Sequence, residues 1–183
     1  MRRLVLLASL LALLGVAFST AAIAARPLTT LTFDELPVQP VDGLSIGGVT
    51  FGFRIGGIPS GDAVYNGFGP GVTTYVEDPS LEGSATGTLT LQFDHPTTIL
   101  RFGIARNCLC TLTPGVSVQL SSPGGQHSQG LISRPTTSLG TFSETLFSYV
   151  GPAIQTAVIT FPSANDAGRF ALDNLTFALV GEG

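Results

Sequence analysis

The sequence predicts an all-β protein, an antiparallel β-sandwich (jelly roll) with about eight strands. Apolar and polar residues alternate in several short segments, and no sustained helical period follows residue 25. The 23 glycines and 12 prolines gather between these segments rather than inside them, which is typical of turns. Two sheets packed face to face would bury the apolar side of every strand.

The first 25 residues are predicted to be a secretory signal peptide. Arg2 and Arg3 precede an apolar run from Leu4 to Phe18, and Ala22-Ile23-Ala24 fits a signal-peptidase site. A membrane-spanning helix is the weaker alternative, because the run is short and ends in small residues without positive flanks. Residues 26–183 are therefore expected to form one secreted domain that has no membrane span after cleavage.

The charge balance argues against nucleic acids and anionic membranes as partners. The chain has eight basic residues, all of them arginines, against twelve acidic ones, and its formal net charge is −4. The basic residues form no cluster. An acidic surface of this kind does not attract polyanions in general.

The predicted strands follow one another with turn-rich gaps. The opening strand covers residues 31–36, and in the next one Val49, Phe51 and Phe53 share a face. Residues 87–105 have the pattern of a hairpin that turns at Asp94–Thr97. Residues 121–140 are expected to be an exposed connection, and further strands are predicted at 115–121, 142–150 and 156–161.

The closing segment, residues 169–177, changes its apolar phase at Asp173-Asn174. Apolar residues occupy even positions before this pair and odd positions after it. Because a strand alternates faces with period two, the phase change predicts a β-bulge. A bulge frees a backbone carbonyl, which together with the Asp173 carboxylate suits Ca²⁺. The alternative is an aspartate that faces solvent at a sheet edge or accepts a bond from a neighbouring amide.

A long segment with little regular pattern, residues 56–87, is expected to be a loop. Its Tyr65, Phe68 and Tyr75 are candidates to stack on sugar rings, and the alternative is that they fold back and hold the loop against the sheet. The acidic residues 77, 78 and 82 either keep this loop solvated or contribute to a second Ca²⁺ site. Because the chain has no Trp platform, we do not expect them to hydrolyse glycosides.

The two cysteines, Cys108 and Cys110, are predicted to form a local disulfide, with two free thiols as the alternative. A hydrolase is not expected. The Gly-x-Ser-x-Gly match at residues 43–47 lacks the strand before it and the helix after it that a nucleophile elbow needs. Neither of the two histidines has an acid partner or nucleophile nearby in the sequence.

Four stretches together resemble a known family: "LTFDELPVQPVDGLSIGGVTFGF", "YNGFGPG", "GTLTLQFDHPTTILRFGIA" and "RFALDNLTF". They are similar to secreted bacterial β-sandwich domains of the galactose-binding-like jelly-roll type, including those of PEP-CTERM exported proteins. Unlike the tailed relatives, this sequence ends at "ALVGEG" without a sorting motif.

The resemblance implies that the first and last strands lie side by side near a structural Ca²⁺. Its acidic ligands would correspond to Asp34, Glu35, Asp42 and Asp173. Because adjacent residues on a strand point to opposite faces, only one of Asp34 and Glu35 is expected to be a ligand. For Asp42, which precedes a glycine, an ordinary turn is the alternative.

These observations lead to one functional expectation and one alternative. The expectation is a non-catalytic, calcium-stabilised extracellular domain that binds a surface or matrix carbohydrate through loops around residues 59–82. The alternative is a structural, self-associating component of an extracellular layer or fibre, in which strand edges meet other subunits.

Overall fold

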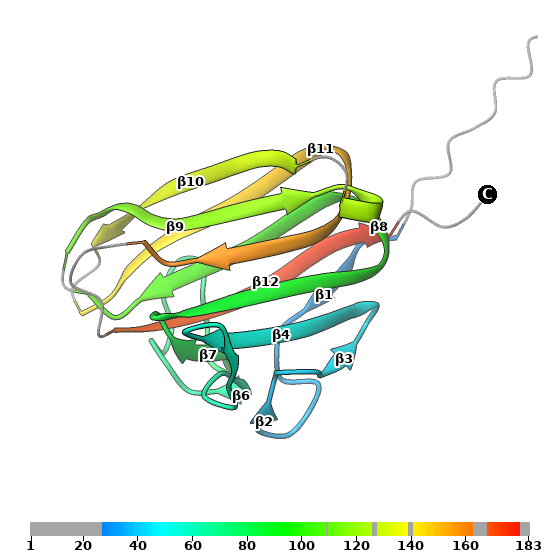
Figure 1. Ribbon diagram of the computed structural model, residues 1–183. Helices are drawn as coiled ribbons and strands as arrows, with labels where there is room; N and C mark the ends of the chain where they lie inside the picture. Colours follow the sequence, from blue (N-terminus) through cyan, green and yellow to red (C-terminus); the bar gives the residue numbers. More distant parts are fainter. Residues whose placement is uncertain (1–26, 109, 126–127, 139–140, 163–167, 180–183) are drawn as a thin grey trace, which may run out of the picture.

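The computed structural model describes residues 27–108, 110–125, 128–138, 141–162 and 168–179. This part of the chain is an antiparallel β-sandwich (Figure 1). The predicted fold class is therefore confirmed. Four of the twelve strands have only two or three residues. The strands are β1 (Thr29–Leu31), β2 (Gln39–Pro40), β3 (Ser45–Ile46), β4 (Val49–Ile55), β5 (Ile58–Pro59), β6 (Val64–Gly67), β7 (Ser80–Ser84), β8 (Gly87–Arg106), β9 (Leu112–Ser121), β10 (Ser128–Ser138), β11 (Ser143–Thr160) and β12 (Arg169–Leu179).

Two long strands fold the sheet over into two layers. β8 runs in one direction over residues 87–93, reverses, and returns over 97–106, and β11 reverses at the same end of the molecule (Figure 1). The first half of β8 pairs with β4 and with the second half of β11, which also pairs with β9. We call this the first layer. The second half of β8 pairs with β12 and with the first half of β11, and we call this the second layer.

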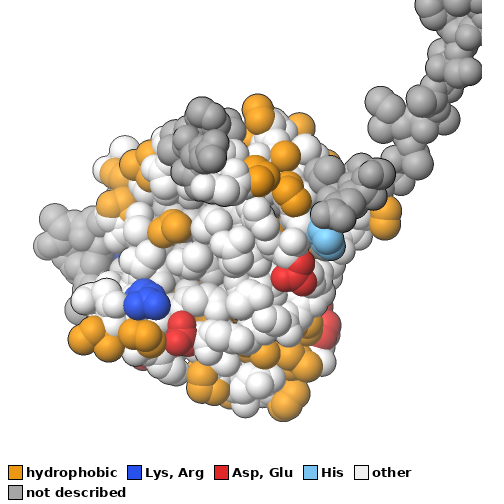
Figure 2. Space-filling view, turned by 45° about the vertical axis from the view of Figure 1, so that its right-hand side comes forward, with side chains coloured by type: hydrophobic (Ala, Val, Ile, Leu, Met, Phe, Trp, Pro, Cys, Tyr) orange, Lys and Arg blue, Asp and Glu red, His pale blue; other side chains and the backbone are white. Residues whose placement is uncertain are grey.

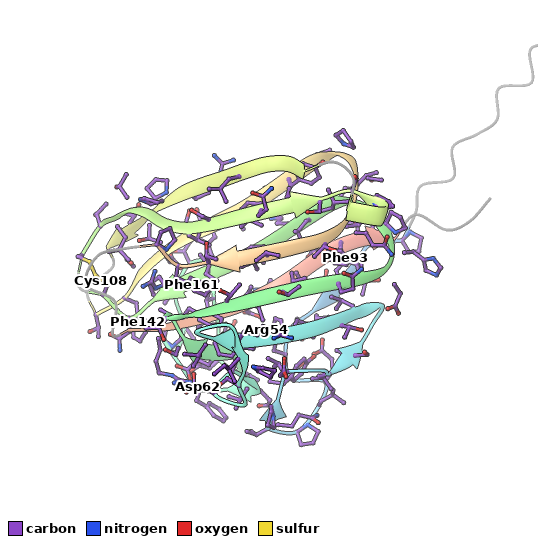
Figure 3. The ribbon with its side chains drawn as sticks, in the orientation of Figure 1. Arg54, Asp62, Phe93, Cys108, Phe142 and Phe161 are labelled. Atoms are coloured by element: carbon purple, nitrogen blue, oxygen red, sulfur yellow. A yellow bond between two sulfur atoms is a disulfide. The ribbon has the colours of Figure 1, made fainter. Side chains whose placement is uncertain are left out.

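Phenylalanine rings fill the space between the layers. Phe93 of the first layer lies 5.1 Å, between ring centroids, from Phe177 of the second, and Phe161 stacks on Phe170 at 4.3 Å. Phe93 and Phe161 lie inside the sandwich in Figure 3. Burying one such ring contributes about 2 to 3 kcal/mol, so the apolar positions of the alternating pattern stabilise the packing of the two layers.

Some predicted elements differ from the structure. The chain reverses at Asp94–Thr97 as expected, but the two arms of β8 pair with β11 rather than with each other, so residues 87–105 are not a hairpin. The segment 121–140, expected to be a connection, contains β10, and the long loop 56–87 contains β6 and β7. Because only part of each of these polar strands is buried, apolar and polar residues alternate weakly in their sequences, and the pattern did not predict a strand.

The predicted β-bulge in β12 is confirmed. Asp173 pairs with Gly103 and Thr176 with Arg101, so two residues of β12 oppose a single residue of β8 between these pairs. Asn174, inside the bulge, has a φ of 55°, a left-handed conformation that asparagine tolerates better than most residues. The extra residue keeps apolar side chains on the core face on both sides of the bulge.

A disulfide joins Cys108 and Cys110, whose Cα atoms lie 5.2 Å apart, at the end of the sandwich where β8 ends (Figure 3). No helix in the described part of the chain has the length and apolar character needed to cross a membrane. The signal peptide predicted for residues 1–25 lies outside the described residues.

Candidate functional site

The loop between β6 and β7 lies across the outer face of the second layer. We call residues 68–79 of this loop the strap. Its Val76 is buried against Ala105 of β8 and Ala171 of β12, which occupy adjacent outward positions. Small side chains at these positions leave room for the strap to approach the sheet. The strap therefore covers one half of this face and leaves the other half open.

Glu144 of β11 anchors the strap from the sheet. Its carboxylate accepts bonds from the Thr73 hydroxyl at 2.7 Å and from the backbone N–H groups of Thr74 and Tyr75 at 3.1 and 2.9 Å. Glu144 is 4% exposed. Burial alone would raise its pKa, but the bonds from the strap outweigh burial and lower the pKa of this carboxyl.

Asp173, the bulge residue, anchors the strap at a second point. Its carboxylate accepts bonds from the N–H of Glu77 at 3.0 Å and from the N–H of Asn174 at 2.6 Å. The Asn174 side-chain amide donates a third bond at 2.9 Å. Burial raises the pKa of Asp173 to about 6 against these hydrogen bonds, and the nearby Glu77 adds to the rise. The bulge thus aims a buried carboxylate at the strap.

A groove of about 480 Å³ lies on the half of the face that the strap leaves open. Its floor is a row of polar side chains that crosses four strands. Ser148 of β11 pairs with Arg101 of β8, Arg101 with Thr176 of β12, and Thr176 with Thr30 of β1. The Thr30 and Thr176 hydroxyls are hydrogen-bonded at 2.9 Å. This row presents hydroxyl groups on both sides of a guanidinium.

Tyr75 of the strap forms one side of the groove. Its side chain is 39% exposed, and its backbone lies directly over Gly103, where a side chain would collide with the strap. Leu28, Ile99 and Val150 add apolar surface to the groove. The groove therefore combines a partly exposed aromatic ring, hydroxyl groups and apolar contacts on a rigid sheet.

Arg101 is the one charged residue among the described residues that line the groove. It is exposed, and within the described part of the chain its guanidinium has no hydrogen bond or ion pair. By contrast, Arg169 pairs with Asp62 at 3.3 Å and with Glu82 at 3.6 Å. On the face shown in Figure 2, charged side chains are sparse, as expected for a chain with 11% charged residues.

The three aromatic residues predicted to bind sugars have different positions. Tyr65 is fully buried, packs against Phe33 at a centroid distance of 5.0 Å, and donates a hydrogen bond to Glu35, so its ring cannot stack on a ligand. Phe68 is 73% exposed but does not line the groove. Only Tyr75 lies in the groove.

The four predicted calcium ligands are also divided. Asp34 and Asp173 line a second, acidic pocket of about 260 Å³, together with Glu77 and Asp78 of the strap. Asp42 does not line this pocket; it precedes Gly43, whose φ of 83° fits the turn considered as the alternative, and one of its carboxylate oxygens accepts the N–H of Phe53 in β4 at 2.9 Å.

Glu35 also lies outside the acidic pocket and accepts bonds from Thr32 and Tyr65. Burial would raise its pKa, but these bonds lower it. The donors that line the pocket suit Ca²⁺ because they are carboxylate and hydroxyl oxygens. However, within the described ranges no three or more acidic, His or Cys side chains are grouped closely enough to hold a metal ion.

The sequence-based reasoning missed Arg101, Gly103 and Glu144. A signal was present for Gly103, because a glycine inside an alternating strand often marks a close backbone approach. Arg101 was visible as a charged residue at an outward position between apolar ones. Glu144 gave no comparable signal, since its role depends on a strap 69 to 71 residues away in the sequence.

The fold and this site define a β-sandwich with an open groove of mixed polar and apolar lining on one sheet face. A scan against protein-family models found no match, and no curated protein matches the chain.

Solved structures with a similar fold include a carbohydrate-binding module of family 29, with a TM-score of 0.44, 9% identity, and coverage of 84% of this chain and 89% of that chain. A Clostridium thermocellum xylanase 10B fragment complexed with xylohexaose gives a TM-score of 0.42 at 15% identity and covers 86% of this chain and 29% of that chain. The enzymatically active domain of a bacteriophage tailspike protein gives a TM-score of 0.39 at 15% identity. The match covers 76% of this chain and 22% of that chain. With TM-scores below 0.5, we infer no function from these similarities.

Proposed function

We propose that this protein is a non-catalytic, secreted domain that binds carbohydrate in the groove beside the strap. One observation carries the proposal: the groove places the Tyr75 ring beside a row of hydroxyl groups and an unpaired guanidinium. Sugars present C–H faces that pack on aromatic rings and hydroxyl groups that need hydrogen-bond partners. A groove with both kinds of surface meets both needs.

The strap and the sheet make the proposed mechanism one of recognition by a preorganised surface. The floor residues belong to paired strands, and Glu144 holds the backbone of Tyr75 before any ligand arrives. Little conformational entropy is then lost when a sugar binds, which favours affinity from a small contact area. The location of the site differs from the expectation, since the floor comes from β1, β8, β11 and β12 rather than from loops alone.

Calcium stabilisation and export are further parts of this proposal. The acidic pocket supports the first, because four acidic residues line it, although in the described part of the chain a bound ion would have to draw their carboxylates closer together. A bound Ca²⁺ would offset their mutual repulsion and connect β12 with the strap. The charged start, apolar run and small residues of the first 25 positions support export.

Affinity electrophoresis against a panel of soluble polysaccharides tests carbohydrate binding. We expect at least one polysaccharide to retard the protein, and we expect Tyr75→Ala to weaken the retardation about tenfold. A ring contact is worth roughly 0.5 to 1.5 kcal/mol beyond the area it buries, and about 1.4 kcal/mol corresponds to a factor of ten in affinity. Phe68→Ala is the matched control. It removes an exposed aromatic residue of the same strap that lies outside the groove.

The melting temperature of each variant separates loss of binding from loss of folding. If no polysaccharide is retained, or if Phe68→Ala weakens retention as much as Tyr75→Ala, carbohydrate binding in this groove is refuted. Concentration-dependent assembly in light scattering, without retention, would instead favour the self-associating structural protein.

A further inference from the structure

The groove carries a positive charge that makes no ion pair within the described part of the protein. Arg101 lies in the middle of the floor, and no acidic residue is among the described residues that line the groove. The chain as a whole has a net charge of −4, so acidic side chains are the more common kind. An isolated arginine in the row of polar residues on the groove floor is therefore a specific feature of this site and not a consequence of a basic surface.

From this placement we propose that the groove selects acidic glycans, whose carboxylate or sulfate group pairs with the Arg101 guanidinium. This inference rests on the proposed carbohydrate-binding function and names the ligand class. The guanidinium fork matches two oxygens of one carboxylate or sulfate, and such charge-assisted pairs are stronger than neutral hydrogen bonds. Ser148 and Thr176, the pairing partners of Arg101, present hydroxyl groups on either side for the sugar hydroxyls.

The geometry also limits how the acidic group approaches. Tyr75 stands at the strap side of the groove, and Val150 and Ile99 form adjacent apolar surface. A sugar ring that packs on Tyr75 can therefore direct its acidic substituent toward the floor, where Arg101 lies two residues from Gly103, the residue beneath the Tyr75 backbone. Asn174 lines both the groove and the acidic pocket, so the two spaces adjoin at this residue.

The test compares matched glycans that differ in charge. Polygalacturonate is the carboxylated probe and highly methyl-esterified pectin is its neutralised counterpart, while a sulfated galactan and agarose form the sulfate pair. We expect stronger retention of at least one acidic member than of its neutral counterpart, and we expect retention to weaken as salt is added. The pair that shows the difference identifies carboxylate or sulfate as the group bound.

Arg101→Gln is expected to weaken binding of the preferred acidic glycan about tenfold or more, and to change binding of the neutral glycan less than about threefold. Arg101→Lys, which keeps the charge and loses the fork, should give an intermediate loss. Arg134→Gln is the charge-matched control, because Arg134 is exposed on β10 and lies outside the groove.

Several results would overturn the inference. Equal effects of Arg101→Gln and Arg134→Gln would show that net charge alone matters. If poly-L-glutamate retains the protein as strongly as the acidic glycan does, and this retention depends on Arg101, the groove binds polyanions without preference for sugars. Preference for the neutral glycans, unaffected by Arg101→Gln, would refute the inference while leaving carbohydrate binding intact, whereas no retention of any glycan would refute both.

Discussion

The close approach of the strap to β8 makes Gly103 a sensitive position. A Cβ at Gly103 would lie 2.6 Å from the Tyr75 carbonyl carbon and closer still to its oxygen, and both atoms are backbone. Because non-bonded carbons need about 3.5 Å, Gly103→Ala forces the strap away from the sheet by roughly 1 Å. Overpacking of this kind costs about 1 to 3 kcal/mol.

The displaced strap would also lose hydrogen bonds. The three bonds to Glu144 measure 2.7 to 3.1 Å, so a shift of roughly 1 Å moves them beyond hydrogen-bond distance. Each hydrogen bond contributes about 1 kcal/mol net to stability, so losing even one of them destabilises the protein beyond the effect of overpacking. We expect Gly103→Ala to lower the free energy of unfolding by about 2 kcal/mol, or Tm by roughly 4 to 8 °C, and to weaken glycan binding through Tyr75.

Thermal unfolding measures the stability change, and hydrogen exchange at the Thr74 and Tyr75 amides reports on the strap. Gly52→Ala is the matched control, because Gly52 lies within β4 and its Cβ would meet Thr90 at an ordinary 3.7 Å. If Gly103→Ala is as stable as Gly52→Ala and its strap amides remain protected, the strap does not rest on this glycine and the reasoning fails.

Two further predictions concern the acidic pocket. The pKa of Asp173 rises from 3.8 to about 6 on folding, so between these values the folded chain holds a proton that the unfolded chain has lost. The contribution of this group to the free energy of unfolding therefore falls by about 3 kcal/mol as pH rises from about 4 to 6. Denaturant titrations should show that the difference in free energy of unfolding between wild type and Asp173→Asn changes by this amount over the same pH range. A difference that stays constant with pH contradicts the prediction. Millimolar Ca²⁺ should raise Tm relative to EDTA, since a ligand at about 100 times its Kd adds roughly 2.7 kcal/mol, and Asp173→Asn should abolish the gain. An equal Tm in Ca²⁺ and EDTA would contradict calcium stabilisation.

The layers of the sandwich were predictable because they depend on local patterns. The alternation at Val49, Phe51 and Phe53 placed β4 correctly, and the phase change at Asp173-Asn174 located the bulge. Turn chemistry at residues 94–97 predicted a reversal but not the pairing partners of its arms. Pairing across a sandwich depends on which distant strand completes each sheet, and a single sequence does not carry that information locally.

The site was less predictable because it is made by contacts between distant segments. Tyr65 and Tyr75 have the same residue type and lie in the segment predicted to be one loop, yet Tyr65 belongs to β6 and is buried beside Phe33, whereas Tyr75 lies in the strap and lines the groove. The alternation of β6 turns Tyr65 toward the core, whereas Glu144 holds the backbone of Tyr75 on the outer face of the second layer. Composition alone could identify candidates for stacking but not the one that a remote carboxylate holds in place.

The bulge in β12 connects the fold with the proposed function. Without the extra residue, the positions after Asp173 would change faces, and Thr176 would point into the core instead of joining Arg101 on the floor of the groove. The same bulge places the Asp173 carboxylate where it accepts the Glu77 N–H, two residues beyond the last strap residue that Glu144 holds. Asp173 therefore has a structural role in holding the strap whether or not Ca²⁺ binds. If the protein proves independent of calcium while its strap depends on Asp173, the calcium part of the proposed function is refuted and carbohydrate binding in the groove still stands.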